Sequence, residues 1–134
     1  MTLTEARARW TEQDRFLGNA TGRQEITMDA GAEKVANSPM ELVLIALCGC
    51  TASDVVNILR KKREPFTGLE VHAVAERAES FPRVYTSIRL NYRVSGNVTH
   101  KAMEDAVRLS KEKYCSVSAM LEKTAKIEVA IEYG

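Results

Sequence analysis

The chain has 134 residues, of which 45% are hydrophobic and 28% are charged, and its formal net charge is +1. This length suffices for one domain with a real core but not for two, so we expect a single domain over residues 1–134. The composition is that of a folded globular protein and excludes a disordered chain. A nearly neutral charge gives no general attraction to nucleic acid or to an anionic membrane, and we expect neither as a partner.

The N-terminal residues and the cysteine count favour a cytoplasmic location. Residues 1–7 lack the basic stretch and apolar core of a secretory signal. The longest apolar run, residues 42–50, is too short to span a bilayer. The three cysteines are an odd number, which argues against an extracellular disulfide framework. We therefore expect a cytoplasmic protein whose thiols are reduced unless they have redox work to do.

Short β-strands are predicted for the first third of the chain. Residues 5–10 alternate between apolar and polar side chains with the period of two that a half-buried strand requires. Further strands are predicted at residues 15–17 and 24–28, separated by a turn at residues 19–22. Residues 30–37 are small and polar, which predicts a loop.

A long helix is the clearest element of the sequence. Ser38, Pro39 and Glu41 place an N-cap serine, a proline at the first helical position and a glutamate at the third. About 24 residues follow before four cations at residues 60–63 and then Pro65 end the helix. From residue 42 to 52 the helix is apolar on every side, so we expect its first half to be buried all round. Because so small a chain cannot cover such a helix alone, we infer a sheet on one face and a second subunit on another.

The second half of the chain completes an α+β arrangement. Strands are predicted at residues 69–76 and 84–94, where Val84, Thr86 and Ile88 share one face, with a connection at residues 79–83. A helix follows at residues 100–114, and its apolar face includes Ser110. Residues 115–118 interrupt this helix before a helical turn at 119–123 and a closing strand at 127–133. The order β-β-β-α-β-β-α-α-β is α+β rather than alternating βαβ units.

The three cysteines allow more than one interpretation. Cys48 and Cys50 are two positions apart, so on a helix they point roughly 200° from each other and cannot share one small site. Cys115 lies at a helix–helix junction, where free backbone N–H groups would favour a thiolate. From composition and spacing alone, inert packing is still the favoured reading of all three. A metal site would need further ligands, and the remaining candidates are His72 and His100. These two histidines do not have the paired spacing of metal ligands, so we expect no metal.

The other polar features have structural explanations. Glu41 completes a capping box with Ser38, a role that accounts for its identity. The cations at residues 60–63 are typical of a solvated helix end. Asp54 is either part of a functional polar surface or the point where the helix emerges from the core. Because the sequence has no glycine-rich phosphate loop and no zinc-protease helix, we expect no cofactor.

Two segments resemble motifs of a known family. Residues 38–56, centred on Leu47-Cys48-Gly49-Cys50-Thr51, resemble the central-helix signature of the OsmC/Ohr family, whose reactive cysteine falls at the position of Cys50. Lys113-Tyr114-Cys115-Ser116-Val117-Ser118 is similar to the family's second cysteine motif, with serine in place of the usual proline. The resemblance covers essentially the whole chain and looks closest to the YhfA-like branch. It implies an intertwined α+β homodimer whose long buried central helices are enclosed by antiparallel sheets, with active sites at the subunit interface.

The resemblance also implies an activity, the thiol-dependent reduction of organic hydroperoxides in oxidative or osmotic stress. Cys50 would attack the peroxide, Cys115 would resolve the sulfenic acid to a disulfide, and a dithiol such as a lipoyl protein would reduce it. The family activates its thiol with an arginine held by a glutamate, for which Arg23 and Glu41 are the candidates and Arg15 the reserve. The alternative is a non-peroxidatic stress protein that binds a small apolar molecule in the dimer-interface pocket.

Overall fold

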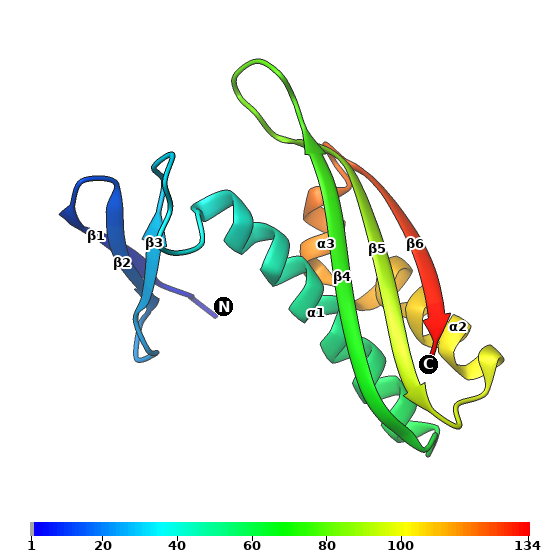
Figure 1. Ribbon diagram of the computed structural model, residues 1–134. Helices are drawn as coiled ribbons and strands as arrows, with labels where there is room; N and C mark the ends of the chain where they lie inside the picture. The colour runs from blue at the N-terminus through cyan, green and yellow to red at the C-terminus, as the bar shows by residue number, and fades with distance from the viewer. Residues whose placement is uncertain (1) are drawn as a thin grey trace. The chain divides into compact units, whose positions relative to one another are not determined.

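The computed structural model describes residues 2–134, which form two compact units (Figure 1). The first unit ends at Leu44 and the second runs from Ile45 to Gly134. Each holds one three-stranded sheet, with strand orders β1-β2-β3 and β4-β5-β6. The long helix α1, Pro39–Lys61, begins in the first unit and continues into the second. The predicted α+β class is confirmed, and the single domain over residues 1–134 stays a prediction.

The sheet of the first unit is antiparallel throughout. It consists of β1 (Ala6–Glu12), β2 (Arg15–Ala20) and β3 (Ile26–Asp29). The tight connection between β1 and β2 contains Gln13, whose φ of 49° is in the left-handed region. Every residue of β1 is exposed, including Trp10 at 63%. The whole of β1, including the large aromatic side chain of Trp10, is therefore exposed on this unit.

Helix α1 begins and ends as the sequence predicts. The Ser38 Oγ accepts the Glu41 N–H at 3.1 Å, and the Glu41 carboxylate accepts the Ser38 N–H at 2.8 Å, so the capping box is formed. At the other end Arg63 adopts a φ of 57°, and the Glu64 N–H bonds back to the Leu59 carbonyl at 3.0 Å. This left-handed residue closes the helix in the way that glycine usually does.

Only one face of α1 is buried by its own chain. Leu47, Thr51, Val55 and Leu59 recur every fourth residue and are all at most 1% exposed. Ile45, in contrast, is 50% exposed, and Gly49 also lies on the surface. The prediction that the first half of α1 is buried all round includes a second subunit on one face and stays a prediction, since a single chain supplies only part of that burial.

The expectation that no segment is long enough to span a bilayer also needs correction. Over an 18-residue window the mean hydropathy of α1 reaches 2.0, so by length and composition this helix is a candidate membrane span. The earlier expectation stopped at Cys50, although the apolar character continues beyond it. Core helices of globular proteins pass the same test, and the buried stripe shows that α1 packs against protein on one side.

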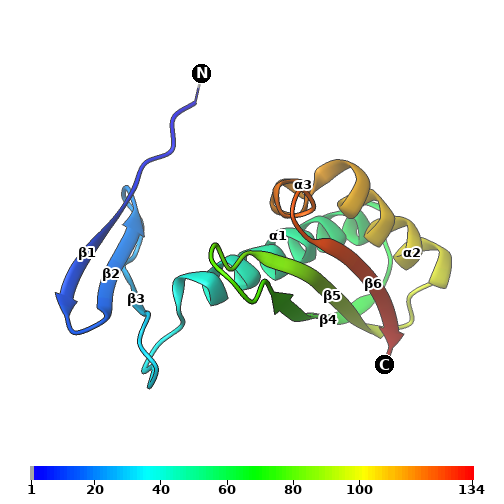
Figure 2. The ribbon, with the colours of Figure 1, turned by 90° about the horizontal axis from the view of Figure 1, so that it is seen from above.

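The sheet of the second unit is mixed. Strands β4 (Phe66–Arg77) and β5 (Tyr85–Gly96) are antiparallel, whereas β6 (Lys126–Tyr133) pairs parallel to β5. The prediction of antiparallel sheets thus holds for every pair except this one. The chain returns from β5 to β6 through helices, and such a crossover is what a parallel pair requires. Figures 1 and 2 show α1, α2 and α3 on the same face of this sheet.

The alternation along β5 differs from the prediction at one end. Ile88, Leu90, Tyr92 and Val94 face the helices and are at most 2% exposed, as the pattern predicts. At the start of the strand, however, Tyr85 is buried and Thr86 is exposed. The register between β4 and β5 shifts between Glu76 and Arg77, so one extra residue enters β5 and reverses the faces there.

The predicted helix over residues 100–114 changes form part-way. Helix α2 covers His100–Leu109, and a π-helical turn, η1, covers Ser110–Tyr114. The Cys115 N–H then bonds to the Ser110 carbonyl at 2.8 Å, the spacing of a π turn. Only Cys115 interrupts the helical path, because α3 (Ser116–Leu121) begins at the next residue, earlier than predicted.

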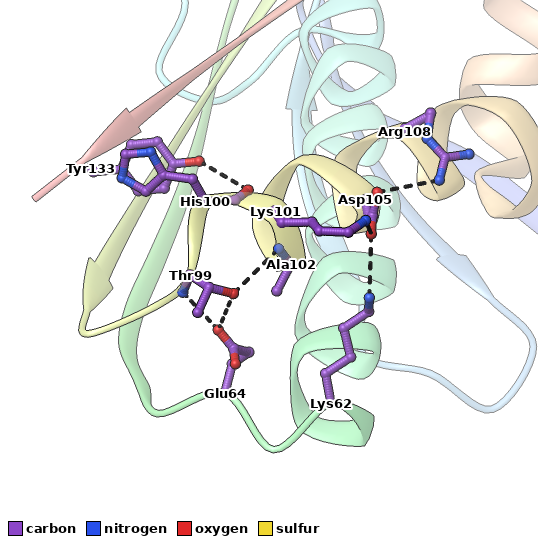
Figure 3. Close-up of polar contacts among 9 residues, drawn as sticks. All are labelled: Lys62, Glu64, Thr99, His100, Lys101, Ala102, Asp105, Arg108 and Tyr133. Carbon is purple, nitrogen blue, oxygen red and sulfur yellow. Dashed lines mark hydrogen bonds and ion pairs between the residues drawn. The ribbon is translucent and has the colours of Figure 1, made fainter.

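Polar contacts fix the start of α2 to the segment after α1 (Figure 3). The Glu64 carboxylate accepts the Thr99 N–H at 2.7 Å and its hydroxyl at 2.9 Å. One turn later Asp105 pairs with three cations, Lys62 at 3.5 Å, Lys101 at 3.0 Å and Arg108 at 3.4 Å. The ends of β6 and α2 also meet, since the rings of Tyr133 and His100 stack at 3.8 Å.

A candidate thiol site between two helices

The structure brings Cys50 and Cys115 together from opposite ends of the second unit's sequence. Cys50 lies in the middle of α1 and is half-buried, while Cys115 is the N-cap residue of α3 and is 3% exposed. The two thiols are neighbours, since the Cys50 side chain is near enough to raise the pKa of the Cys115 thiol. Neighbouring thiols can form a disulfide when they are oxidised.

The surroundings of Cys115 favour its protonated form. Burial raises the pKa of the Cys115 thiol, and both the hydrogen bond to Cys50 and the charge on a Cys50 thiolate raise it further. The Ser118 backbone N–H donates to the Cys115 sulfur at 3.4 Å and acts in the opposite direction. The prediction that free N–H groups would favour a thiolate at Cys115 is therefore only partly right, because burial outweighs them.

A chain of buried hydroxyl groups runs beside the thiol pair. The Thr51 hydroxyl lies 2.6 Å from the Tyr92 hydroxyl and 2.8 Å from the Ser110 hydroxyl, and these three residues are at most 1% exposed. The Ser110 hydroxyl donates to the Asp54 carboxylate at 2.8 Å. The chain therefore links β5, α1 and η1 and ends on a charged group.

The hydrogen-bond direction along this chain follows from counting protons. A hydroxyl carries one proton, and Ser110 gives its proton to Asp54, so Thr51 must donate to Ser110. The Thr51 proton is then used, so Tyr92 must donate to Thr51. All of the bonds point toward the Asp54 carboxylate, an arrangement in which each bond polarises the next. Asp54 is thus part of a polar network as well as the point where α1 reaches the surface.

Sequence reasoning missed Thr51, Tyr92 and Ser110. The sequence pattern places all three on faces predicted to be buried, and that pattern does not distinguish a hydroxyl residue from an apolar one. Buried hydroxyl groups need partners, so three such residues on three predicted inner faces were the available signal. Their convergence could be found only in three dimensions.

Cys48 lies two residues before Cys50 on α1. It is half-buried, and burial raises the pKa of its thiol. Two positions along a helix separate it from Cys50, as the sequence predicts. Packing is the role that its position supports.

The two predicted activating residues lie in the first unit. The Glu41 carboxylate is engaged by the capping box with Ser38 and by Lys34 at 3.8 Å, and these contacts lower its pKa. Arg23 follows the turn at Gly22 and its side chain is exposed. The assignment of Arg23 and Glu41 to thiol activation stays a prediction.

The reserve candidate, Arg15, is engaged with a buried carboxylate that the sequence reasoning missed. The Arg15 Nε lies 3.6 Å from Asp29, which is 3% exposed. The backbone N–H groups of Gly31 and Val35 also donate to Asp29, and all of these contacts lower the pKa of its carboxyl group. This cluster organises the loop that precedes α1.

A surface cavity of about 320 Å³ lies where the hydroxyl chain reaches Asp54. It is lined by Asp54, Asn57, Ile58, Lys61, Lys62, Leu109 and Tyr114. Neither Cys50 nor Cys115 lines it. Within residues 2–134, no group of three His, Cys, Asp or Glu side chains is arranged to hold a metal ion.

Comparison with known proteins decides the family. Residues 31–130 match the family described as OsmC-like protein, and this segment contains both thiols and the whole hydroxyl chain. The chain belongs to the OsmC family. Its sequence is also 44% identical over 129 residues to Protein YhfA of Escherichia coli K12, with 96% of each chain covered.

Two solved structures show the same fold. A hypothetical protein from Aquifex aeolicus VF5 is 33% identical and has a TM-score of 0.87, with 100% of this chain and 99% of that chain covered. An organic hydroperoxide resistance protein from Elizabethkingia anophelis has a TM-score of 0.78 at 14% identity, covering 100% and 98% of the two chains. At that identity the second likeness concerns the fold alone. The predicted resemblance to the OsmC/Ohr family is confirmed.

Proposed function

We propose that this protein is a thiol-dependent reductase of organic hydroperoxides that uses Cys50 and Cys115 as its redox pair. The observation that carries the proposal is that the residue after Cys50 is bonded to Ser110, whose carbonyl accepts the Cys115 N–H, so that thiols from separate helices are neighbours. Membership of the OsmC family supports it, since members of similar fold are described as organic hydroperoxide resistance proteins.

The reaction divides into three balanced steps. The Cys50 thiolate attacks one peroxide oxygen, the O–O bond breaks, and the leaving alkoxide takes a proton to become an alcohol. The Cys115 thiol then attacks the Cys50 sulfenic acid, which forms the disulfide and releases water. A dithiol reductant, for which a lipoyl group is suitable, finally exchanges with the disulfide, returning both thiols and leaving as its own cyclic disulfide.

The different surroundings of the two cysteines support their different roles. Cys50 is half-buried and so retains some access to a substrate, whereas Cys115 is almost fully buried. The raised pKa of Cys115 lowers its thiolate fraction, which makes it poorly suited to the first attack on the peroxide. We therefore assign the attack to Cys50 and the resolving step to Cys115.

The protein acts, in this proposal, as a homodimer. Ile45 is 50% exposed on α1, and Trp10 and Ile26 are 63% and 48% exposed on the first sheet. A lone chain would leave these large apolar side chains in water at a cost, whereas a second copy would bury them. A second copy would also complete the burial of α1 that its all-round apolar sequence predicts.

The proposal is tested by the consumption of cumene hydroperoxide by pre-reduced protein in a stopped-flow instrument. The parent and Cys115→Ser should each consume one equivalent rapidly, the parent ending as the disulfide and the variant as the sulfenic acid, whereas Cys50→Ser should consume none. Cys48→Ser, as the matched control from the same helix, should behave like the parent. If the reduced parent leaves the peroxide intact, the enzyme hypothesis fails and a non-peroxidatic binding protein takes its place.

A further inference from the structure

The turn of α1 that carries Cys50 is bonded to the turn that carries Cys115. Thr51 immediately follows Cys50, and its hydroxyl bonds to that of Ser110 at 2.8 Å. Ser110 begins η1, and its carbonyl accepts the Cys115 N–H at 2.8 Å. A short path of two hydrogen bonds therefore connects the backbone beside one thiol to the backbone of the other.

This connection is supported on both sides. Tyr92, from the centre of β5, donates to Thr51 from the sheet, and Asp54, one turn after Cys50, accepts from Ser110. In the described part of the chain no buried side-chain N or O atom lacks a partner, so the network is complete. A fully satisfied buried network holds its members in one geometry, whereas the loss of one member leaves the others unpaired.

We propose that the Tyr92–Thr51–Ser110–Asp54 chain is a clamp that positions Cys50 and Cys115 for disulfide formation. This inference rests on the proposed function, since it concerns the same thiol pair. The four residues are positioning residues. They hold the π turn against α1, and because Cys115 directly follows this turn, they also fix the position of Cys115 next to Cys50. Ser110 is the first residue of the π turn and its carbonyl accepts the Cys115 N–H, so an anchor on its side chain acts at the residue to which Cys115 is bonded.

The clamp predicts how the thiols behave when it is broken. Without the Thr51 hydroxyl, the reduced protein samples a wider range of Cys50–Cys115 separations. Disulfide formation must then order the pair as well as oxidise it, which lowers the effective concentration of one thiol at the other. The change is specific to the thiol pair and differs from a general loss of stability.

The test is a redox equilibrium between the full-length protein and dithiothreitol, in a Cys48→Ser background that prevents other pairings. In this equilibrium the Cys50 and Cys115 thiols are oxidised to the disulfide while cyclic oxidised dithiothreitol is reduced to the dithiol. The fraction of protein that carries the disulfide gives the effective concentration of one thiol at the other. We expect Thr51→Val and Ser110→Ala to lower this value about 10-fold, because both remove the Thr51–Ser110 hydrogen bond between α1 and η1. Thr51→Ser keeps the hydroxyl and should restore it to within about 2-fold of the parent.

Val55→Ala is the control for stability. Val55 is 0% exposed and lies one turn after Thr51 on the same buried stripe, but it takes no part in the hydroxyl chain. Its truncation should lower the melting temperature and leave the effective concentration within about 2-fold of the parent. Ser110→Ala removes the clamp from the η1 side, so the comparison does not depend on the folding of Thr51→Val alone.

The clamp and the enzyme can fail separately. An effective concentration that is unchanged in both Thr51→Val and Ser110→Ala, or a parent that forms no Cys50–Cys115 disulfide, overturns the clamp. An effect on Val55→Ala equal to that on Thr51→Val also overturns it, because the cause is then stability. A parent that forms the disulfide with dithiothreitol but ignores peroxide overturns the proposed enzyme and leaves the clamp standing.

Discussion

The fold of the chain holds the phenolic proton of Tyr92 firmly. Its side chain is 1% exposed, and burial raises the pKa of its phenol to about 12 from an ordinary 10.0. The folded chain therefore binds this proton more tightly than the unfolded chain does. The stabilisation is fully present below pH 10 and is lost as the pH rises from 10 to 12.

This shift predicts an alkaline transition specific to Tyr92. Between pH 10 and 12 the parent should lose about 2–3 kcal/mol of unfolding free energy more than Tyr92→Phe does, as two units of pKa imply. Urea unfolding at several pH values measures the difference, and other groups that titrate in this range cancel between the two proteins. Equal alkaline losses in parent and variant would contradict the assigned burial of the phenol.

At the same scale, the sequence predicted which residues face inward better than it predicted their chemistry. The buried positions of β5 and the separation of Cys48 from Cys50 follow from the periods of strand and helix. The contact between Cys50 and Cys115 and the bonds of Thr51 could not be derived this way. They depend on how α1, β5 and η1 pack, and residues that meet there are far apart in sequence.

The start of α1 is an element that the sequence predicted correctly. Ser38→Ala removes the side chain that accepts the Glu41 N–H and should lower the unfolding free energy by about 1 kcal/mol. Glu41→Gln keeps an acceptor for the Ser38 N–H and should cost less than Ser38→Ala. Thermal unfolding of both variants measures the order, and a larger loss in Glu41→Gln would show that its charge does more than cap the helix.

The attachment of α2 predicts an acid-sensitive contact. The hydrogen bond from Lys101, with contributions from Arg108 and Lys62, holds the pKa of Asp105 below its ordinary value of 3.8. The stabilisation is therefore present above pH 3.8 and is lost as the pH falls through the depressed folded value. Asp105→Asn should abolish this part of the acid dependence, so circular dichroism across pH 2–5 should show a shallower loss for the variant.

Among the elements, the least predictable was the passage from α2 to α3. Residues 100–114 have a helical pattern that does not distinguish an α-helix from an α-helix ending in a π turn. The parallel pairing of β6, where antiparallel sheets were predicted, could not be derived from the sequence either, because an alternating strand reads the same in either direction. Both depend on the tertiary position of the last helices against the sheet.

For the whole molecule, the exposed apolar face of α1 predicts assembly. Ile45→Glu would place an unpaired carboxylate in the proposed dimer interface and should weaken the dimer by about 100-fold or more. Sedimentation should give the parent twice the chain mass of 14.9 kDa and the variant a single chain mass. Val74→Glu is the control, since Val74 is 59% exposed on the sheet and lies outside α1. A monomeric parent would contradict the homodimer.

At this scale the resemblance of two short motifs predicted the family and the α+β fold, and both are confirmed. The periodicity of α1 predicted more burial than one chain provides. A sequence pattern records the surroundings of a residue in the functional assembly, while the fold of one chain supplies only part of them. The same difference applies to the predicted activating pair, Arg23 and Glu41. Their predicted role concerns the functional assembly, whereas the contacts described above are those within the first unit of one chain.

The most direct test of the account is peptide mass spectrometry of the reduced protein after one equivalent of cumene hydroperoxide. The account predicts a chain lighter by about 2 Da and a single cross-linked pair of peptides that joins Cys50 to Cys115. Unmodified thiols, or a disulfide that involves Cys48 in place of Cys50, would contradict the assignment of the redox pair.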